Sequence, residues 1–192
     1  MRIPVELPKA YRLLNHGPTV LVGAAHAGRR NVMAAAWAMP LDFDPPKVAV
    51  VIDKSTVTRG LVEASGEFSL GVPCRDFADA TFTVGSVSAR DVPGEDKFER
   101  YGLASFAGSA TGAPLLEGCV AWLECRLLRE PRNQQLYDLF LGEVVAAQAD
   151  SRVFRDGRWQ FDPGQEGLRT LHHLGGGAFL STDDPMQARL LP

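Results

Sequence analysis

The chain has 192 residues, of which 45% are hydrophobic and 22% are charged, and this composition excludes a disordered or fibrous protein. The formal net charge of −3 does not indicate a basic surface for binding nucleic acid. No uninterrupted apolar stretch is as long as the roughly 18 residues that a membrane-spanning helix needs. We therefore expect one domain over residues 1–192, with no nucleic acid and no membrane as partners.

The three cysteines argue for a reducing compartment. Cys74, Cys119 and Cys125 are odd in number and lack C-x-x-C spacing, which disfavours a disulfide framework. Residues 1–11 contain no apolar segment of the kind found in secretory signal peptides. These features predict a cytoplasmic protein.

Strand-like segments dominate the chain. Apolar or β-branched runs predict strands at 19–25, 31–37, 47–53, 67–72, 119–127 and 136–147. Short helices are expected from a cap at Thr58 to Gly66, over 75–83, and over 95–101. The 19 glycines and 13 prolines, one residue in six, indicate many turns.

Two of these strands carry more detailed predictions. In 119–127 the odd positions are all apolar while Glu124 and Arg126 lie on the other side, so one face should be core and the other partly wet or at an interface. Gly142 predicts a bulge or bend within 136–147. Because long crossover helices are missing between strands, we expect a mainly β barrel with short peripheral helices rather than a doubly wound α/β fold.

Familiar catalytic and metal motifs are absent. The run of Gly175 to Gly177 would need a further glycine where Leu180 stands to form a dinucleotide fingerprint, and no P-loop or G-x-S-x-G sequence occurs. His172 and His173 are neighbours on an expected strand and should point to opposite faces, which disfavours a metal site. We predict no metal and no catalytic side-chain nucleophile.

Other residues suit a phosphorylated ligand with a flat ring. Lys54, Ser55, Thr56 and Thr58 lie between a strand and a helix start, where hydroxyls and free backbone N–H groups can bind phosphate. Arg90 and Lys97 could add charge-assisted hydrogen bonds. The small residues from 34 to 36 would let a ring lie close to the backbone, with Trp37 as a wall or lid.

Each of these residues also has a purely structural interpretation. The 55–58 segment could be only a turn and helix cap, Asn31 a turn residue, and Trp37 a core residue. Arg90 and Lys97 could be solvated surface, and His172 or His173 an ordinary loop or strand histidine. Gly175 to Gly177 would most simply form a tight turn.

Several segments taken in order resemble one family. They are N-V-M-A-A-A-W at 31–37, P-P at 45–46, T-x-x-L-V at 58–62, S-G-E-F at 65–68, G-S-V-S-A-R-D at 85–91 with K-F at 97–98, A-P-L at 113–115, L-F-L-G-E-V at 139–144, and L-H-H-L-G-G-G-A-F at 171–179. This order is similar to that of the flavin reductase-like proteins with an FMN-binding split barrel, which include the flavoredoxins. The resemblance covers about residues 10–180, the expected core of the domain.

The resemblance implies a Greek-key split β-barrel that binds FMN at a homodimer interface and receives electrons from NADH or NADPH. Tyr137 stands where relatives often have a histidine, and Phe179 matches an aromatic after the H-L-G-G turn. The cofactor-binding residues expected from the resemblance and from their chemistry are Asn31, Val32, Met33, Ala35, Ala36, Trp37, Lys54, Ser55, Thr56, Thr58, Ser88, Arg90, Lys97, Tyr137, His173 and Phe179.

Three other functions remain compatible with the sequence. The protein could be an FMN electron carrier that does not use NAD(P)H directly, or a flavin-free interaction domain on the same fold. A flavin oxidase acting on a small amine or alcohol is a more distant alternative. The flavin reductase interpretation requires hydride transfer from nicotinamide to flavin in an open pocket.

Overall fold

The structure is a computed structural model that describes residues 1–92, 94, 96–184, 186 and 188. It is mainly β, as predicted. The strands are β1 (Arg2–Pro4), β2 (Val20–His26), β3 (Arg29–Ala35), β4 (Ala38–Phe43), β5 (Pro46–Val51), β6 (Glu67–Pro73), β7 (Ser105–Phe106), β8 (Leu115–Leu116), β9 (Cys119–Leu128), β10 (Leu139–Asp150), β11 (Phe154–Arg155), β12 (Arg158–Trp159), β13 (Leu171–Gly175) and β14 (Ala178–Ser181). The helices are α1 (Val57–Ser65), α2 (Ala78–Ser86), α3 (Lys97–Tyr101) and α4 (Pro131–Tyr137), with short 3-10 helices at Leu7–Leu13, Arg75–Phe77, Ala89–Asp91 and Glu166–Leu168.

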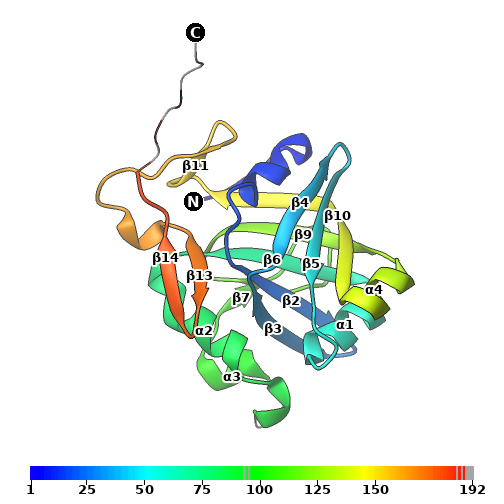
Figure 1. Ribbon diagram of the computed structural model, residues 1–192. Helices are drawn as coiled ribbons and strands as arrows, with labels where there is room; N and C mark the ends of the chain where they lie inside the picture. The colour runs from blue at the N-terminus through cyan, green and yellow to red at the C-terminus, as the bar shows by residue number, and fades with distance from the viewer. Residues whose placement is uncertain (93, 95, 185, 187, 189–192) are drawn as a thin grey trace.

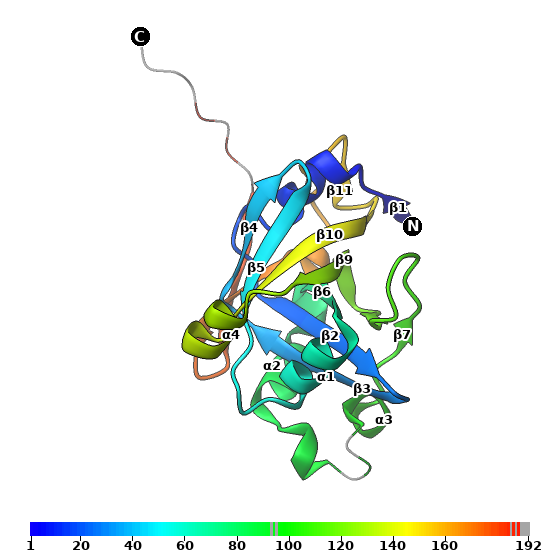
Figure 2. The ribbon, with the colours of Figure 1, turned by 90° about the vertical axis from the view of Figure 1, so that its right-hand side faces the viewer.

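One antiparallel sheet forms the body of the domain. Its strand order is β3-β2-β6-β9-β10-β5-β4, and β1 pairs with β10. The sheet is strongly curved, and the short helices lie around it rather than between its strands (Figures 1 and 2). The β13–β14 hairpin forms a separate ribbon beside α2 (Figure 1). None of the helices in the described part of the chain is long and apolar enough to span a bilayer.

Both faces of β9 are buried from Cys119 to Cys125, so the expected wet part of the second face is limited to Arg126. Leu123 and Cys125 belong to the main core, while Trp122 belongs to a second apolar cluster on the opposite face. Glu124 is 2% exposed because its carboxylate accepts backbone hydrogen bonds from a loop at 109–111 that covers it. Only Arg126, near the end of β9, is exposed.

β10 has an irregularity, but it does not lie at Gly142, where the sequence predicts a bulge or bend. The register of β10 shifts between Val144 and Ala146, whereas Gly142 pairs regularly with β5 and β9. A Cβ atom at Gly142 would collide with the ring of Phe68. The glycine therefore allows close packing rather than a bend.

Several element boundaries also differ from the predictions. β3 ends at Ala35, and β4 follows as an unpredicted edge strand, a position where Pro40 is tolerated. Residues 136 and 137 belong to α4 instead of β10, and Asp138, with a φ of 53°, ends that helix. The predicted 75–83 helix is a 3-10 turn followed by α2. α3 runs from Lys97 to Tyr101 between the caps Asp96 and Gly102. Residue 95 of the predicted segment lies outside the described residues.

The cap of α1 is Thr56 rather than Thr58. The Thr56 hydroxyl accepts a 3.3 Å hydrogen bond from the backbone N–H of Arg59, and Gly66 ends the helix in the left-handed conformation, as predicted. Thr58 is completely buried on the inner side of the first turn. The cysteines at 74, 119 and 125 are buried free thiols.

Candidate functional site

Two neighbouring pockets lie along β3. We call the first the polar pocket; it has a volume of about 220 Å³ and is lined by Asn31, Met33, Ser55, Thr56, Val57, Thr58, Val84, Gly85, Ser86, Val87, Ser88, Ala89 and Lys97. We call the second the aromatic pocket; it has a volume of about 280 Å³ and is lined by Thr19, Ala34, Ala35, Ala36, Thr81, Phe82, Gly85, Ser86, His173, Gly176, Gly177 and Phe179. Gly85 and Ser86 line both pockets, so the two are adjacent.

The C-terminal end of α2 packs tightly on β3 where the pockets meet. A Cβ atom at Gly85 would lie 2.9 Å from the Cβ of Ala34, closer than real side chains approach. Glycine at 85 and alanine at 34 therefore bring the helix against the strand. This close approach sets the width of the junction between the pockets.

Asn31 forms part of the floor of the polar pocket. It is 2% exposed, and its Nδ2 donates a 2.9 Å hydrogen bond to the Oγ1 of Thr58, which joins β3 to α1. Its Oδ1 is buried and has no partner among the described residues. Because a buried amide oxygen normally accepts a hydrogen bond, Asn31 has an acceptor left for a ligand.

Lys97 is a buried cation at the same pocket, so its interpretation as solvated surface is wrong. Its side chain is 3% exposed, and its Nζ donates to the carbonyl oxygens of Val32 at 3.1 Å and Val84 at 2.7 Å. Burial lowers the pKa of Lys97 to about 8. An ammonium group has three N–H donors, so one is left after these two bonds.

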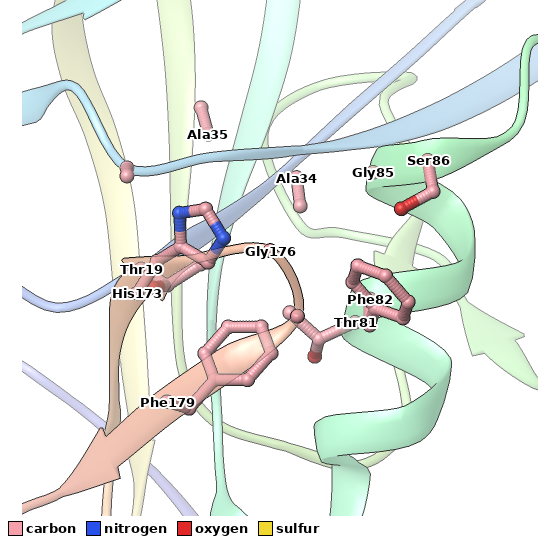
Figure 3. A pocket seen from close by; sticks show the side chains of 12 residues that line it. Thr19, Ala34, Ala35, Thr81, Phe82, Gly85, Ser86, His173, Gly176 and Phe179 are labelled. Carbon is pink, nitrogen blue, oxygen red and sulfur yellow. The ribbon is translucent and has the colours of Figure 1, made fainter.

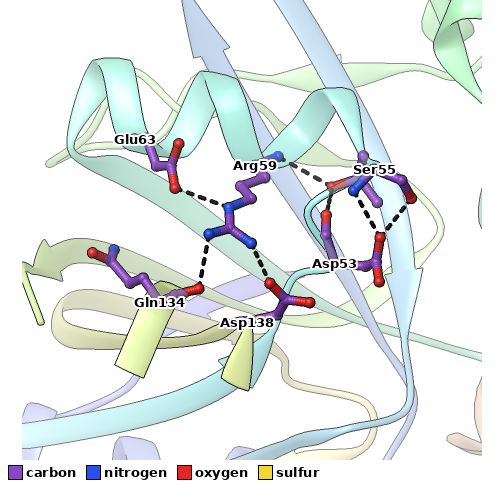
Figure 4. A network of polar contacts seen from close by, with 7 residues as sticks. Asp53, Ser55, Arg59, Glu63, Gln134 and Asp138 are labelled. Carbon is purple, nitrogen blue, oxygen red and sulfur yellow. Dashed lines mark hydrogen bonds and ion pairs between the residues drawn. The ribbon is translucent and has the colours of Figure 1, made fainter. Parts of the chain in front are cut away.

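The segment before α1 is held by its own hydrogen bonds (Figure 4). The carboxylate of Asp53 accepts from the backbone N–H of Ser55 at 2.7 Å and from its hydroxyl at 2.5 Å. These bonds from Ser55 lower the pKa of Asp53 below its ordinary value. The Thr56 hydroxyl donates to the backbone oxygen of Asp53 at 2.8 Å. The segment is thus fixed as a turn and cap, and it also lines the polar pocket.

Arg59 connects this segment to α4, and sequence reasoning missed it. Its guanidinium forms an ion pair with Asp138, another with Glu63 at 2.9 Å, and a 2.8 Å hydrogen bond to the carbonyl of Gln134 (Figure 4). The side chain is only 12% exposed, so these partners offset the cost of its burial. No local pattern could have indicated this, because Arg59 and Asp138 are 79 positions apart.

The aromatic pocket is closed on one side by the β13–β14 hairpin. His173 and Phe179 face each other across this hairpin with ring centres 5.2 Å apart, and Phe82 approaches from α2 (Figure 3). Gly177, with a φ of 83°, lies so close to Phe82 that a Cβ there would be 3.0 Å from its ring. No Lys, Arg, Asp or Glu is among the described residues that line this pocket. It therefore suits a flat, uncharged group.

The adjacent histidines point in different directions, as predicted. The His172 ring packs edge-on against His16, with centres 5.5 Å apart, while His173 lines the aromatic pocket. Burial, followed by the neighbouring His172, lowers the pKa of His16 to about 4. Although His16 lies far from His172 in sequence, the fold brings them together. In the described part of the chain, no three His, Cys, Asp or Glu residues gather as a metal site would require.

Most of the predicted site residues come together in these pockets. The eleven that line them are Asn31, Met33, Ala35, Ala36, Ser55, Thr56, Thr58, Ser88, Lys97, His173 and Phe179. The five that do not are Val32, Trp37, Lys54, Arg90 and Tyr137. Sequence reasoning missed Thr19, Thr81 and Phe82, because no spacing relates them to β3. It noted Gly85 and Ser86 only as part of the resemblance and did not expect them to line the site.

The five residues outside the pocket linings differ in their surroundings. Val32 is buried and contributes its carbonyl to Lys97, whereas Lys54 is exposed. Trp37 is 75% exposed, so its interpretation as core is wrong in this chain, and Tyr137 is 65% exposed at the end of α4. Arg90 is exposed and bonds to the backbone of Ser55.

A curved antiparallel sheet with this two-part site places the chain among the small split-barrel proteins. The chain belongs to the flavin reductase-like family, since the model of the flavin reductase like domain matches residues 12–164. It is 53% identical over 183 residues to the uncharacterized protein YddH of Escherichia coli K12, covering 94% of each chain. It is 31% identical over 131 residues to a flavin reductase of Pseudomonas putida, covering 65% of this chain and 67% of that one.

A solved structure shares almost the whole fold. The FMN-binding domain of a flavin reductase-like enzyme from Shewanella baltica superposes with a TM-score of 0.94 at 46% identity, covering 98% of both chains. The expected split-barrel fold and the expected family are thereby confirmed.

Proposed function

We propose that this protein binds FMN across the two pockets and acts as a flavin reductase that accepts hydride from NADH or NADPH. The observation that carries the proposal is the pair of adjacent pockets, one rich in hydroxyls with a buried cation and the other neutral and aromatic. FMN has two matching parts. Its dianionic phosphate and hydroxylated chain suit the polar pocket, and its flat ring suits the aromatic pocket.

The residues present fit this cofactor. The unpartnered Oδ1 of Asn31 can accept a hydrogen bond from a ribityl hydroxyl, and the remaining proton of Lys97 can be donated to an anionic or carbonyl oxygen. Ser88 and the free N–H groups of the first turn of α1 can bind the phosphate. No protonated carboxyl or metal is needed for any of these contacts.

Bound FMN would supply the hydride chemistry, so the protein needs only to bind, orient and adjust charge. Lys97 holds a positive charge in a site of low dielectric, where it stabilises negative charge more strongly than in water. Phe82, His173 and Phe179 provide flat surfaces that can align a second ring and limit the access of water. This arrangement explains why no side-chain nucleophile is expected.

We further propose that the active form is a homodimer. Trp37, Met39, Leu41 and Phe43 are exposed by 75, 54, 47 and 63% and recur at every second position along the edge strand β4 and the residue before it. A row of large apolar side chains on an unpaired sheet edge is a typical contact surface. A second copy of this chain would cover this row of side chains.

Similarity supports a flavin cofactor and is compatible with the proposed reductase activity. The family model is named for flavin reductases, the Shewanella baltica structure is described as an FMN-binding domain, and the Pseudomonas putida relative is named a flavin reductase. An electron carrier would share the same cofactor site, so the choice of electron donor separates the two functions.

The test is an anaerobic titration of FMN-loaded protein with NADH and then with NADPH, followed by the visible absorbance of the flavin. We expect stoichiometric bleaching by one donor within the mixing time. Bound flavin that stays yellow with both donors would contradict the reductase and favour an electron carrier. A chain that cannot be loaded with FMN would contradict the whole proposal and leave a flavin-free interaction domain.

A further inference from the structure

Thr19 has an unsatisfied hydroxyl and lines the aromatic pocket. The residue directly precedes β2 and is 3% exposed, and its Oγ1 is buried with no hydrogen-bond partner among the described residues. Its backbone N–H donates a 2.8 Å hydrogen bond to the carbonyl of Leu171 at the start of β13. His173, two residues further along β13, lines the same pocket (Figure 3). The backbone therefore holds Thr19 in place without using its hydroxyl.

A second threonine of the same pocket shows the ordinary arrangement. Thr81 is completely buried, and its hydroxyl donates a 2.8 Å hydrogen bond to the carbonyl of Phe77. A buried hydroxyl without a hydrogen bond destabilises the folded chain, and most buried polar groups in proteins are paired. Valine has nearly the same shape without the hydroxyl, so stability alone would favour valine at position 19. The unpaired hydroxyl of Thr19 is thus what a group satisfied by a ligand leaves behind.

Each of the two pockets contains one such atom. Seven buried side-chain nitrogen and oxygen atoms lack a partner among the described residues. Of these seven, only Oδ1 of Asn31 and Oγ1 of Thr19 belong to residues that line either pocket. Asn31 lines the polar pocket and Thr19 the aromatic pocket, so each part of the site keeps a hydrogen-bonding group unused by the protein.

We propose that Thr19 positions the flavin ring through a hydrogen bond between its hydroxyl and the polar edge of that ring. This inference rests on the proposed function, because it needs the ring to occupy the aromatic pocket. The pyrimidine part of a flavin carries two carbonyl oxygens and an N–H group, and a hydroxyl can donate or accept. Rotation about the Cα–Cβ bond exchanges the hydroxyl with the methyl group, so the hydroxyl can turn towards the pocket that the side chain lines.

The depth of Thr19 favours the flavin over the nicotinamide as its partner. Thr19 is 3% exposed, whereas Phe82, on the α2 side of the same pocket, is 44% exposed. A ring that fills the pocket contacts its buried lining. A nicotinamide that stacks on this ring from the solvent side would lie one ring thickness further out, where the exposed side chains are.

Three substitutions isolate the hydroxyl. Thr19→Val removes it and keeps the shape of the side chain, while Thr19→Ser keeps it and removes the methyl group. Thr81→Val is the matched control, because it makes the same change at a buried threonine of the same pocket whose hydroxyl is already paired. Riboflavin, which has the ring but not the phosphate, serves as the second ligand beside FMN.

The experiment measures the dissociation constants of FMN and riboflavin by flavin fluorescence, the absorption spectrum of the bound flavin, and the thermal unfolding of the apoprotein. We expect Thr19→Val to weaken both ligands by the same factor, about threefold to tenfold, because the ring is common to both. The long-wavelength absorption band of the bound flavin should shift in this variant, and its apoprotein should unfold at the same or a higher temperature. Thr19→Ser should bind FMN within about twofold of the wild type, and Thr81→Val should change neither affinity nor spectrum.

Three results for Thr19→Val would overturn the inference and leave the proposed function intact. The first is wild-type affinity with a wild-type spectrum. The second is weaker binding of FMN but not of riboflavin, which would place the contact away from the ring. The third is an apoprotein that unfolds at a lower temperature, which would give the hydroxyl a structural partner. A wild-type chain that binds neither flavin would instead overturn the proposed function, and the inference with it.

Discussion

The side-chain amide of Asn31 donates a 2.9 Å hydrogen bond to the hydroxyl of Thr58, and this single bond joins strand β3 to the first turn of α1 beneath the polar pocket. Both residues are almost completely buried. The other amide atom, Oδ1, has no partner among the described residues. We therefore expect Asn31 to contribute both to the stability of the apoprotein and to the proposed binding of FMN.

Asn31→Ala should lower the stability of the apoprotein and weaken the binding of FMN. The buried hydroxyl of Thr58 would lose its partner, so we expect the free energy of unfolding to fall by about 1–3 kcal/mol, as measured by urea denaturation. Loss of the acceptor should weaken FMN binding about tenfold, measured by fluorescence titration. Asn15→Ala, at an exposed position outside both pockets, is the control. Unchanged FMN affinity in the Asn31 variant would remove Asn31 from the cofactor site.

Lys97 should give opposite pH dependences for binding and for stability. Its pKa is lowered to about 8 by burial, so the pocket loses its positive charge as the pH rises through 8. The phosphate of FMN is already a dianion above pH 7, since its second pKa is about 6. We therefore expect FMN affinity to fall between pH 7 and 9 in the wild type. In Lys97→Met this fall should disappear.

The stability of the apoprotein should change in the other direction. Between pH 8 and the ordinary lysine pKa of 10.5, the unfolded chain binds more protons at this residue than the folded chain does. The contribution of Lys97 to the free energy of unfolding therefore rises with pH in this range. Urea denaturation of the wild type and of Lys97→Met from pH 7.5 to 10 measures the difference. A difference that does not depend on pH would contradict the lowered pKa of Lys97.

Glu124 should be important for the stability of the fold but not for the binding of FMN. Burial acts to raise its pKa, but hydrogen bonds from the backbone N–H groups of Ser109, Ala110 and Thr111 outweigh it, and the net pKa is lowered. Glu124→Gln would place N–H groups against these donors, so we expect a loss of about 2–4 kcal/mol in the free energy of unfolding.

The pH dependence at Glu124 has a definite sign. Because the folded pKa is below the unfolded value of 4.5, the stabilisation is complete above that value and is lost as the pH falls through the folded pKa. The surface variant Glu117→Gln, at a 46% exposed side chain, should change stability by less than about 1 kcal/mol. Equal losses in the two variants would contradict the importance of the buried carboxylate.

Leu41→Glu should convert the proposed dimer into a monomer. In a symmetric dimer the substitution places a glutamate from each protomer in the same apolar contact. Both carboxylates would lose their hydration there. Light scattering after size exclusion measures the mass, and we expect FMN binding to weaken with it. Leu7→Glu, at another exposed leucine, should leave the mass unchanged. A wild-type chain that is monomeric at micromolar concentration would contradict the proposal.

The sequence by itself determined the mainly β class, the family and eleven of the residues that line the two pockets. The β-branched run at 47–53 and the apolar runs at 19–25 and 67–72 became β5, β2 and β6 within two residues at each end. Runs of this kind are recognisable because burial of a strand acts on consecutive residues along the chain. The ordered motifs then placed Asn31, Thr58 and Lys97 in one site without any knowledge of their contacts.

Only the tertiary structure decided which side chains are buried and what they face. Lys97 lies on a short helix with charged neighbours, yet contacts with β3 and α2 bury it, whereas Trp37 follows an apolar run and is exposed. Phe82 enters the site from a helix that no spacing relates to β3, and Arg90 reaches Ser55 across 35 positions. Periodicity reports how a residue relates to its neighbours along the chain. Burial, pKa and pocket shape depend instead on groups that only folding brings close.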